Sequence, residues 1–159
     1  MDSIIVFVAK YFFVISVVAV GVYWLLASKS VRWRLIWEMV IGGALAIALA
    51  KIGAHFYYDT RPFVSQHIKP LFSHAPDNGF PSDHTLLTSF IGFTMLAYSR
   101  RLGVLLLLNA LLVGASRVAA HVHSPIDIIG SFVFAGIAVL ATRWIVTRLY
   151  EVPATRPKV

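Results

Sequence analysis

Five stretches of mostly apolar residues follow one another along the chain, and short polar segments separate them. They cover residues 4–27, 35–58, 83–99, 102–122 and 125–147. A helix that crosses a bilayer needs about 20 predominantly apolar residues, with a range of about 17–25. The third stretch is short and begins within its polar flank. The pattern predicts an all-α fold, a polytopic transmembrane helical bundle of about five spans.

Lysine and arginine gather in alternate connections of this predicted bundle. Cytoplasmic segments of membrane proteins are rich in these residues. The N-terminus, the 59–82 loop and the 121–124 turn are therefore expected on the outer side, and the C-terminus on the inner side. The 59–82 loop has room for a short helix. The basic residues are Lys29, Arg32, Arg34, Arg100, Arg101, Arg143, Arg148, Arg156 and Lys158.

No internal repeat or low-complexity segment divides the chain. We therefore expect residues 1–150 to form a single transmembrane domain. The proline-containing residues 151–159 are expected to form a loose cytoplasmic tail.

Two lysines interrupt the apolar pattern. Lys10 lies within the first stretch, where it either extends towards the nearer membrane surface or marks residues 1–9 as an interfacial segment. Lys51 lies deep in the second stretch. Helical side chains tilt towards the helix N-terminus, which is on the cytoplasmic side in this span. Lys51 is therefore expected to point away from the outer face, and the sequence assigns it no partner.

The composition narrows the choice of partners. The chain is 58% hydrophobic, has a net charge of +7 and contains no cysteine. Such a charge in a soluble protein would suggest nucleic acid, but no basic run here is interleaved with aromatic residues. We expect membrane lipids and no nucleic acid as partners, and we leave the oligomeric state open. Disulfides and thiolate metal sites are excluded.

Three short polar clusters lie at the predicted outer ends of the spans. They are Arg61-Pro62, Pro81-Ser82-Asp83-His84, and Ser116-Arg117 followed by His123 and Asp127. Ionisable residues at membrane depth are costly and mark functional sites. Arginine matches phosphate oxygens in a bidentate manner. The clusters contain the residue types that are needed to bind a phosphate and cleave it.

Each cluster also has a purely structural interpretation. Ser82 fits a helix N-cap, and backbone N–H groups at such a terminus also attract anions. Asp127 fits a capping box at a helix start, a role compatible with accepting a hydrogen bond from His123. Pro62 could end the second span, whereas Arg117 is expected well inside the fourth span and needs an anionic partner there.

A metal site is the weaker alternative for the histidines. His121 and His123 with Asp127 could form one, but no His-x3-His or Glu-x2-His pair occurs. We therefore predict neither a metal ion nor another cofactor.

Taken together, the three clusters resemble the signature of the type 2 phosphatidic acid phosphatase superfamily. Its blocks are Lys-x6-Arg-Pro, Pro-Ser-Gly-His and Ser-Arg-x5-His-x3-Asp, and the third block matches in full from Ser116 to Asp127. Ala54 stands where the first block has its lysine, and Asp83 replaces the glycine of the second. These departures, and residues 74–84, are similar to the BcrC-type undecaprenyl pyrophosphate phosphatases.

The resemblance implies metal-independent phosphoryl transfer through a phosphohistidine. It implies His123 as nucleophile, Asp127 as the group that orients it, and His84 as general acid and base. The implied substrate is a polyprenyl lipid diphosphate, undecaprenyl diphosphate, whose hydrolysis recycles the lipid carrier of cell-wall synthesis and confers bacitracin resistance. The implied location is the bacterial cytoplasmic (inner) membrane, with the site facing the periplasm or the exterior. The phosphate-binding residues would be Arg61, Arg117, Ser82, Asp83 and Ser116.

Several alternatives stay open. The substrate could be another lipid phosphate, such as phosphatidate, phosphatidylglycerol phosphate or lipid A phosphate. A small membrane transporter is disfavoured because only Lys51 lies deep on the inner side, and vanadate-binding oxidases share the constellation but resemble soluble proteins. The missing lysine either weakens the binding of a monophosphate or reflects, with Asp83, a charge arrangement for a diphosphate.

Overall fold

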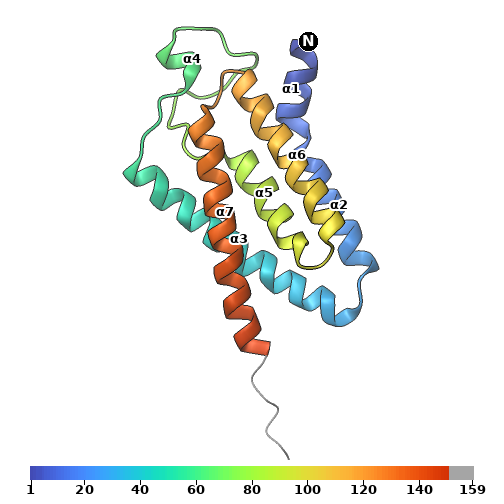
Figure 1. Cartoon of the computed structure of the whole chain (residues 1–159). Coiled ribbons are helices and arrows are strands. Elements are labelled where there is room, and N and C mark those ends of the chain that lie inside the picture. Colours follow the sequence, from blue (N-terminus) through green and yellow to red (C-terminus); the bar gives the residue numbers. More distant parts are fainter. Residues whose placement is uncertain (151–159) are drawn as a thin grey trace, which may run out of the picture.

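A computed structural model describes residues 1–150 of the chain. Helices and their connections account for this part, with one isolated β-bridge between Thr60 and Asn78. The predicted all-α membrane fold is confirmed (Figure 1). The helices are α1 (Asp2–Tyr11), α2 (Phe13–Leu26), α3 (Lys29–Phe56), α4 (Pro62–Ser65), α5 (Asp83–Leu96), α6 (Arg100–Ala119) and α7 (Pro125–Tyr150).

Three of these helices, α3, α6 and α7, are long and apolar enough to cross a membrane. The pair α1 and α2 qualifies as a fourth span that is bent by 40°. In the place of the third predicted span, α5 has only 14 residues, about 21 Å at 1.5 Å per residue, against a hydrocarbon core of about 30 Å. This helix is mostly buried and contacts α2, α3, α6 and α7, so it lies inside the bundle.

The short α5 creates a recess at one end of the molecule. It is joined to α6 by the tight 97–99 turn, and the two helices pack closely: a Cβ on Gly103 would lie 2.5 Å from the backbone nitrogen of Leu96. Because α6 has 20 residues, the start of α5 lies about 9 Å short of the end of α6. The residues that begin α5 therefore form the floor of a recess.

The bend between α1 and α2 is stabilised from the side by α6. Asn109 Nδ2 donates to the carbonyl oxygen of Phe12 and to Ser16 Oγ, both at 3.0 Å. At the end of α1, the Lys10 ammonium lies 5.0 Å from the centre of the Phe72 ring, in the loop before α5. Asn109 thus provides a polar contact where the break leaves backbone groups without helical partners.

Helix boundaries match the sequence prediction at two ends and differ at two others. The predicted starts of α5 at Asp83 and α7 at Pro125 are confirmed. However, α3 ends at Phe56, and Pro62 begins the separate helix α4, so Pro62 does not end the second span. The fourth span ends at Ala119 rather than at residue 122.

The start of α7, the α4 loop and the N-terminus lie at the same end of the bundle, and α7 runs towards the opposite end (Figure 1). The predicted tail, residues 151–159, lies outside the described residues.

Candidate active site

Segments far apart in the sequence meet at the recess and enclose a cavity of about 280 Å³. Five predicted site residues line it: Arg61, Asp83, His84, Arg117 and His123. The cavity also receives polar residues that the sequence analysis had not included in the site: Lys51, His74, Asp77 and Asn78.

His123 and Asp127 form a buried pair at the start of α7. His123 Nδ1 lies 3.0 Å from Asp127 Oδ2, and the same oxygen accepts the backbone N–H of Ser124 at 2.9 Å. Both side chains are almost fully buried. Asp127 therefore caps the start of α7 and also orients His123. Because a carboxylate accepts, the proton lies on Nδ1 and Nε2 carries the lone pair.

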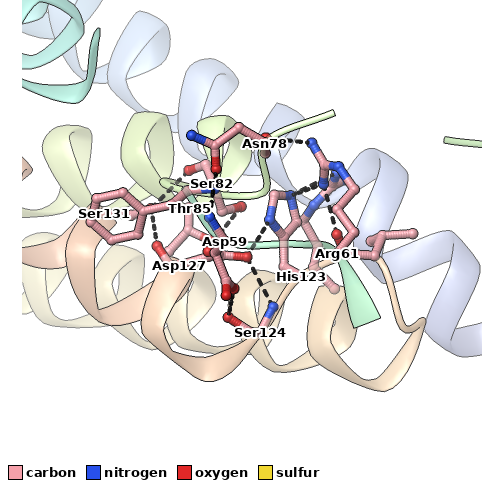
Figure 2. Close-up of polar contacts among 12 residues, drawn as sticks. Asp59, Arg61, Asn78, Ser82, Thr85, His123, Ser124, Asp127 and Ser131 are labelled. Atoms are coloured by element: carbon pink, nitrogen blue, oxygen red, sulfur yellow. Dashed lines mark hydrogen bonds and ion pairs between the residues drawn. The ribbon is translucent and has the colours of Figure 1, made fainter. Parts of the chain in front are cut away.

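Two arginines approach Nε2 of His123. Arg61 and Arg117 each place a terminal guanidinium nitrogen 3.3 Å from His123 Nε2 (Arg61 and His123 are labelled in Figure 2). Arg61 also donates to the carbonyl oxygen of Val122 at 2.7 Å, and Arg117 to that of Ala9 at 3.3 Å. Two fixed cations beside a nucleophilic nitrogen suit the equatorial oxygens of a phosphoryl group.

Arg117 reaches this position because α6 ends early. It lies in the last turn of α6, not deep within the span as expected. The backbone N–H groups of Val122 and His123 both donate to the Arg117 carbonyl oxygen, at 3.2 and 3.4 Å, and His121 adopts a positive φ of 63°. This turn brings His123 back over the arginine six residues before it.

The loop before α5 provides a second set of partners for the arginines. Asp77 Oδ1 accepts from Arg61 Nε at 2.8 Å, and His74 Nε2 accepts from a terminal nitrogen of Arg117 at 3.0 Å. Although desolvation favours the neutral acid, the hydrogen bond and charge of Arg61 hold the pKa of Asp77 below its usual value. Burial, followed by the charge of Arg61, lowers the pKa of His74. A neutral His74 can accept the Arg117 hydrogen bond.

The same electrostatics act on the candidate nucleophile. Burial lowers the pKa of His123, the hydrogen bond to Asp127 opposes that shift, and the charges of Arg117 and Arg61 add to it. The net shift is downward from 6.5. His123 is therefore neutral, and able to attack phosphorus, over most of the physiological pH range.

Asn78 organises the loop that closes the cavity (Figure 2). Its side-chain oxygen accepts the backbone N–H groups of Asp59 and Phe80, and its amide nitrogen donates to the carbonyl oxygens of Ala54 and Tyr57. An asparagine that follows an aspartate in a polar loop is a common turn signal. Nothing in the sequence indicated that this one joins the loop to the end of α3.

Gly79 permits the close approach of this loop to the buried pair. A Cβ at this position would lie 2.8 Å from Asp127 Oδ2 and 3.2 Å from the carbonyl oxygen of Asp59. Asp127 Oδ2 already accepts hydrogen bonds from His123 and Ser124. The carboxylate therefore cannot move away freely, and only glycine fits.

Two predicted phosphate-binding serines do not line the cavity. Ser116 Oγ donates to the Val113 carbonyl oxygen at 2.7 Å, within α6. Ser82 precedes α5 as its N-cap residue, and its hydroxyl accepts from Thr85 Oγ1 at 3.2 Å. Its carbonyl oxygen accepts from Ser131 Oγ at 2.9 Å, which ties the start of α5 to α7. In this arrangement both serines form hydrogen bonds within or between the helices that carry the site, and neither lines the cavity.

His84 and Asp83 begin α5 on the floor of the cavity. The His84 ring packs edge-on against Phe13, with ring centres 5.2 Å apart. Asp83 is exposed at the first turn, where its negative charge complements the helix dipole.

The structure corrects the expectation for Lys51 and does not assemble the alternative metal site. Lys51 lines the cavity with Ala54, one turn further along α3, so it does not point away from the outer site. Within residues 1–150, no group of three or more histidine and acidic side chains has the geometry to hold a metal ion. His121 does not line the cavity.

Comparisons with known proteins identify the family of the chain. Residues 34–151 match the family model of the PAP2 superfamily. The chain is 33% identical over 135 residues to undecaprenyl-diphosphatase BcrC of Bacillus subtilis, covering 85% of this chain and 69% of that protein. It is 31% identical to the bacitracin transport permease protein BcrC of Bacillus licheniformis, covering 94% of this chain and 73% of that protein.

A solved structure shows the same fold. The crystal structure of Aquifex aeolicus LpxE superposes with a TM-score of 0.67 at 22% identity, covering 90% of this chain and 85% of that one. The match to the family model and the similarity to these relatives agree with the helical fold described above. The chain belongs to the PAP2 superfamily and is a multi-pass membrane phosphatase.

Proposed function

We propose that this phosphatase hydrolyses undecaprenyl diphosphate to undecaprenyl phosphate and inorganic phosphate through a phosphohistidine at His123. The observation that carries the chemistry is the position of His123 Nε2, 3.3 Å from both Arg61 and Arg117, with Nδ1 bonded to Asp127. The choice of lipid rests on the similarity to undecaprenyl-diphosphatase BcrC.

In the first half-reaction, His123 Nε2 attacks the terminal phosphorus of the lipid diphosphate. The N–P bond forms as the bond from that phosphorus to the bridging oxygen breaks, and the bridging oxygen takes the electron pair. His84 protonates this oxygen, so undecaprenyl phosphate leaves. Arg61 and Arg117 stabilise the charge on the equatorial oxygens, and Asp127 stabilises the cationic imidazole.

In the second half-reaction, water attacks the phosphohistidine. His84 accepts a proton from that water, the N–P bond breaks, and inorganic phosphate leaves with the electron pair of the N–P bond returned to Nε2. Ser82 and Ser116 remain predicted contributors to phosphate binding, through backbone groups or a rearranged side chain. All steps use groups of this chain, so we expect activity to persist in EDTA.

The proposed location is the bacterial cytoplasmic membrane, with the site on its outer face. The basic residues at the 28–34 and 99–102 connections support this orientation. The connection between α6 and α7, which contains His123, lies at the opposite end of the bundle from these connections (Figure 1). The prenyl chain would stay in the bilayer while the diphosphate enters the cavity.

The nucleophile is tested by trapping the intermediate. Purified protein is mixed with prenyl diphosphate labelled with ³²P in the terminal phosphoryl group and quenched in alkali, which preserves phosphohistidine. We expect label on the wild type and none on His123→Ala, which also loses turnover. His121→Asn is the matched control, because asparagine tolerates a positive φ. Label or normal turnover in His123→Ala would reject the mechanism.

The substrate class is tested by initial rates on purified protein with EDTA present. Undecaprenyl diphosphate is compared with phosphatidate, phosphatidylglycerol phosphate and a lipid A phosphate. The proposal predicts the highest kcat/KM for undecaprenyl diphosphate. A higher value for any of the other lipids would replace the substrate but retain the phosphatase chemistry, and loss of all activity in EDTA would reject the metal-free mechanism.

A further inference from the structure

Lys51 lines the same cavity as the two arginines, yet it has no salt bridge or side-chain hydrogen bond within the described residues. It lies on the face of α3 that also presents Ile47, Ala50 and Ala54 to the cavity. An ionisable side chain within a membrane-crossing helix is costly unless it serves a site. The proposed mechanism does not use this lysine.

The charges around the cavity leave one part of a diphosphate without a partner. Arg61 and Arg117 both approach Nε2 of His123, so they serve the phosphoryl group that is transferred. The second phosphoryl group, attached to the lipid, carries its own negative charge away from that nitrogen. Lys51 is the remaining lysine or arginine that lines the cavity within residues 1–150.

The position of Lys51 along α3 fits this second group. It lies five residues before Phe56, the end of α3, which is about 7.5 Å along the helix. Lys51 lines the same cavity as Asp83 and His84 at the start of α5. Ala50 directly before it and Ile47 one turn earlier on α3 make the neighbouring cavity lining apolar. Lys51 therefore shares a cavity with the arginines and lies next to apolar lining, which suits the first carbons of a prenyl chain.

From this arrangement, and resting on the proposed function, we infer that Lys51 binds the lipid-attached phosphoryl group of a prenyl diphosphate. It thereby favours diphosphates over monophosphates. When the bridging bond breaks, the leaving lipid phosphate gains negative charge, and a nearby ammonium group stabilises that charge. A prenyl monophosphate has no second phosphoryl group to receive this contact.

The test compares farnesyl diphosphate with farnesyl phosphate as substrates of the purified protein. Removing one hydrogen bond to a charged group costs about 1.5–3 kcal/mol, which is about tenfold to 150-fold in kcat/KM. We expect Lys51→Met to lower the ratio of kcat/KM for the diphosphate to kcat/KM for the monophosphate by about tenfold or more. Lys51→Arg should restore most of that ratio.

Lys69→Met is the matched control, because Lys69 is exposed in the loop of the same outer face and does not line the cavity. Its ratio should equal that of the wild type. Equal losses for both substrates in Lys51→Met would overturn the inference and leave the proposed function standing. A wild type that hydrolyses other lipid phosphates but neither prenyl substrate would instead reject the proposed function.

A second measurement is independent of turnover chemistry. Inhibition of each variant by methylenediphosphonate, which cannot be cleaved at its bridge, is compared with inhibition by orthophosphate. Lys51→Met should weaken the diphosphonate about tenfold or more relative to orthophosphate. An unchanged relative inhibition in a variant that elutes as a well-folded protein would overturn the inference.

Discussion

At the scale of single residues, the candidate site is organised around one ring nitrogen. The carboxylate of Asp127 fixes the proton of His123 on Nδ1, and two guanidinium groups lie beside Nε2. These arginines donate to the lone pair that is proposed to attack phosphorus. A bound phosphoryl group offers them better acceptors, so substrate binding itself would release the nucleophile.

Titration of His123 gives the first prediction. Its pKa is lowered below 6.5, mainly by burial, and the Asp127 hydrogen bond opposes that shift. Asp127→Asn should therefore lower the pKa further, so that the ring is more often neutral at any given pH. Turnover should nevertheless fall by about 100-fold or more, because the Nδ1–H tautomer is no longer fixed.

The measurement is a titration of ¹³C-labelled histidine by NMR between about pH 4 and pH 8, with His123→Gln used to assign the signal. A His123 pKa above 6.5 in the wild type would contradict the electrostatic account. A higher pKa, or retained turnover, in Asp127→Asn would do the same.

Asp77 gives a second prediction at this scale. Its exposed carboxylate forms an ion pair with Arg61 at 2.8 Å. Arg61 is proposed to bind phosphate. Asp77→Asn removes this competing negative charge, and an exposed ion pair is worth about 0–1 kcal/mol. Orthophosphate should therefore inhibit the variant more strongly, by up to about fivefold. Asp2→Asn is the control, because Asp2 lies at the start of α1 and does not line the cavity. Weaker inhibition of Asp77→Asn by orthophosphate would contradict the competition between Asp77 and phosphate for Arg61.

At the scale of helices, the hairpin of α5 and α6 determines where the floor of the site lies. A Cβ on Gly103 would be 2.5 Å from the Leu96 backbone, which cannot move aside like a flexible side chain. Gly103→Ala should therefore separate the two helices, displace His84 and reduce the stability by about 1–3 kcal/mol.

The matched control is Gly136→Ala in α7, whose new Cβ would meet only Phe93 at 3.8 Å. Both changes gain about 1 kcal/mol of helix propensity, so the difference between them isolates the packing. Thermal unfolding of the detergent-solubilised protein measures it. A Gly103→Ala protein as stable as Gly136→Ala would show that the hairpin tolerates separation.

The presence of each helix was easier to predict from the sequence than the residues at which it begins and ends. The starts at Asp83 and Pro125 were found because each follows a serine cap, and proline also suits the first helical turn. The end of α6 was missed because residues 118–122 are mostly apolar and continue the hydrophobic run. The break at Phe12 was missed for the same reason: its partner Asn109 is almost a hundred residues away.

The residues of the site likewise divide into those that the sequence indicated and those that it did not. Arg61, His84, Arg117 and His123 were selected because ionisable residues stand out in an apolar chain, and all four line the cavity. His74, Asp77 and Asn78 belong to a polar loop in which such residues are ordinary, so only tertiary contacts identify them. Lys51 was expected to point away from the site because helical side chains tilt towards the helix N-terminus. The cavity extends inward along α3 and reaches Lys51 all the same.

At the scale of the whole molecule, the α4 loop and the α6–α7 connection, which contributes His123 to the cavity, lie at one end of the bundle (Figure 1). The chain contains no cysteine, so single cysteines can report its orientation. We expect Gln66→Cys to react with a membrane-impermeant maleimide in intact cells, and Ser30→Cys to react only after permeabilisation. The opposite pattern would place the cavity on the cytoplasmic side and reject the proposed sidedness.

The short α5 has a consequence for substrates that share the same lipid. Since His84 lies on the floor of the recess, about 9 Å below the end of α6, a diphosphate must enter the recess between the helices to meet this residue. A bare diphosphate can do so, but a diphosphate capped with a sugar would have to bring the sugar into a cavity of about 280 Å³ already crowded by Arg61, His74 and Arg117. If the proposed substrate is correct, the depth of the recess would exclude the sugar-bearing lipid and admit the bare lipid diphosphate.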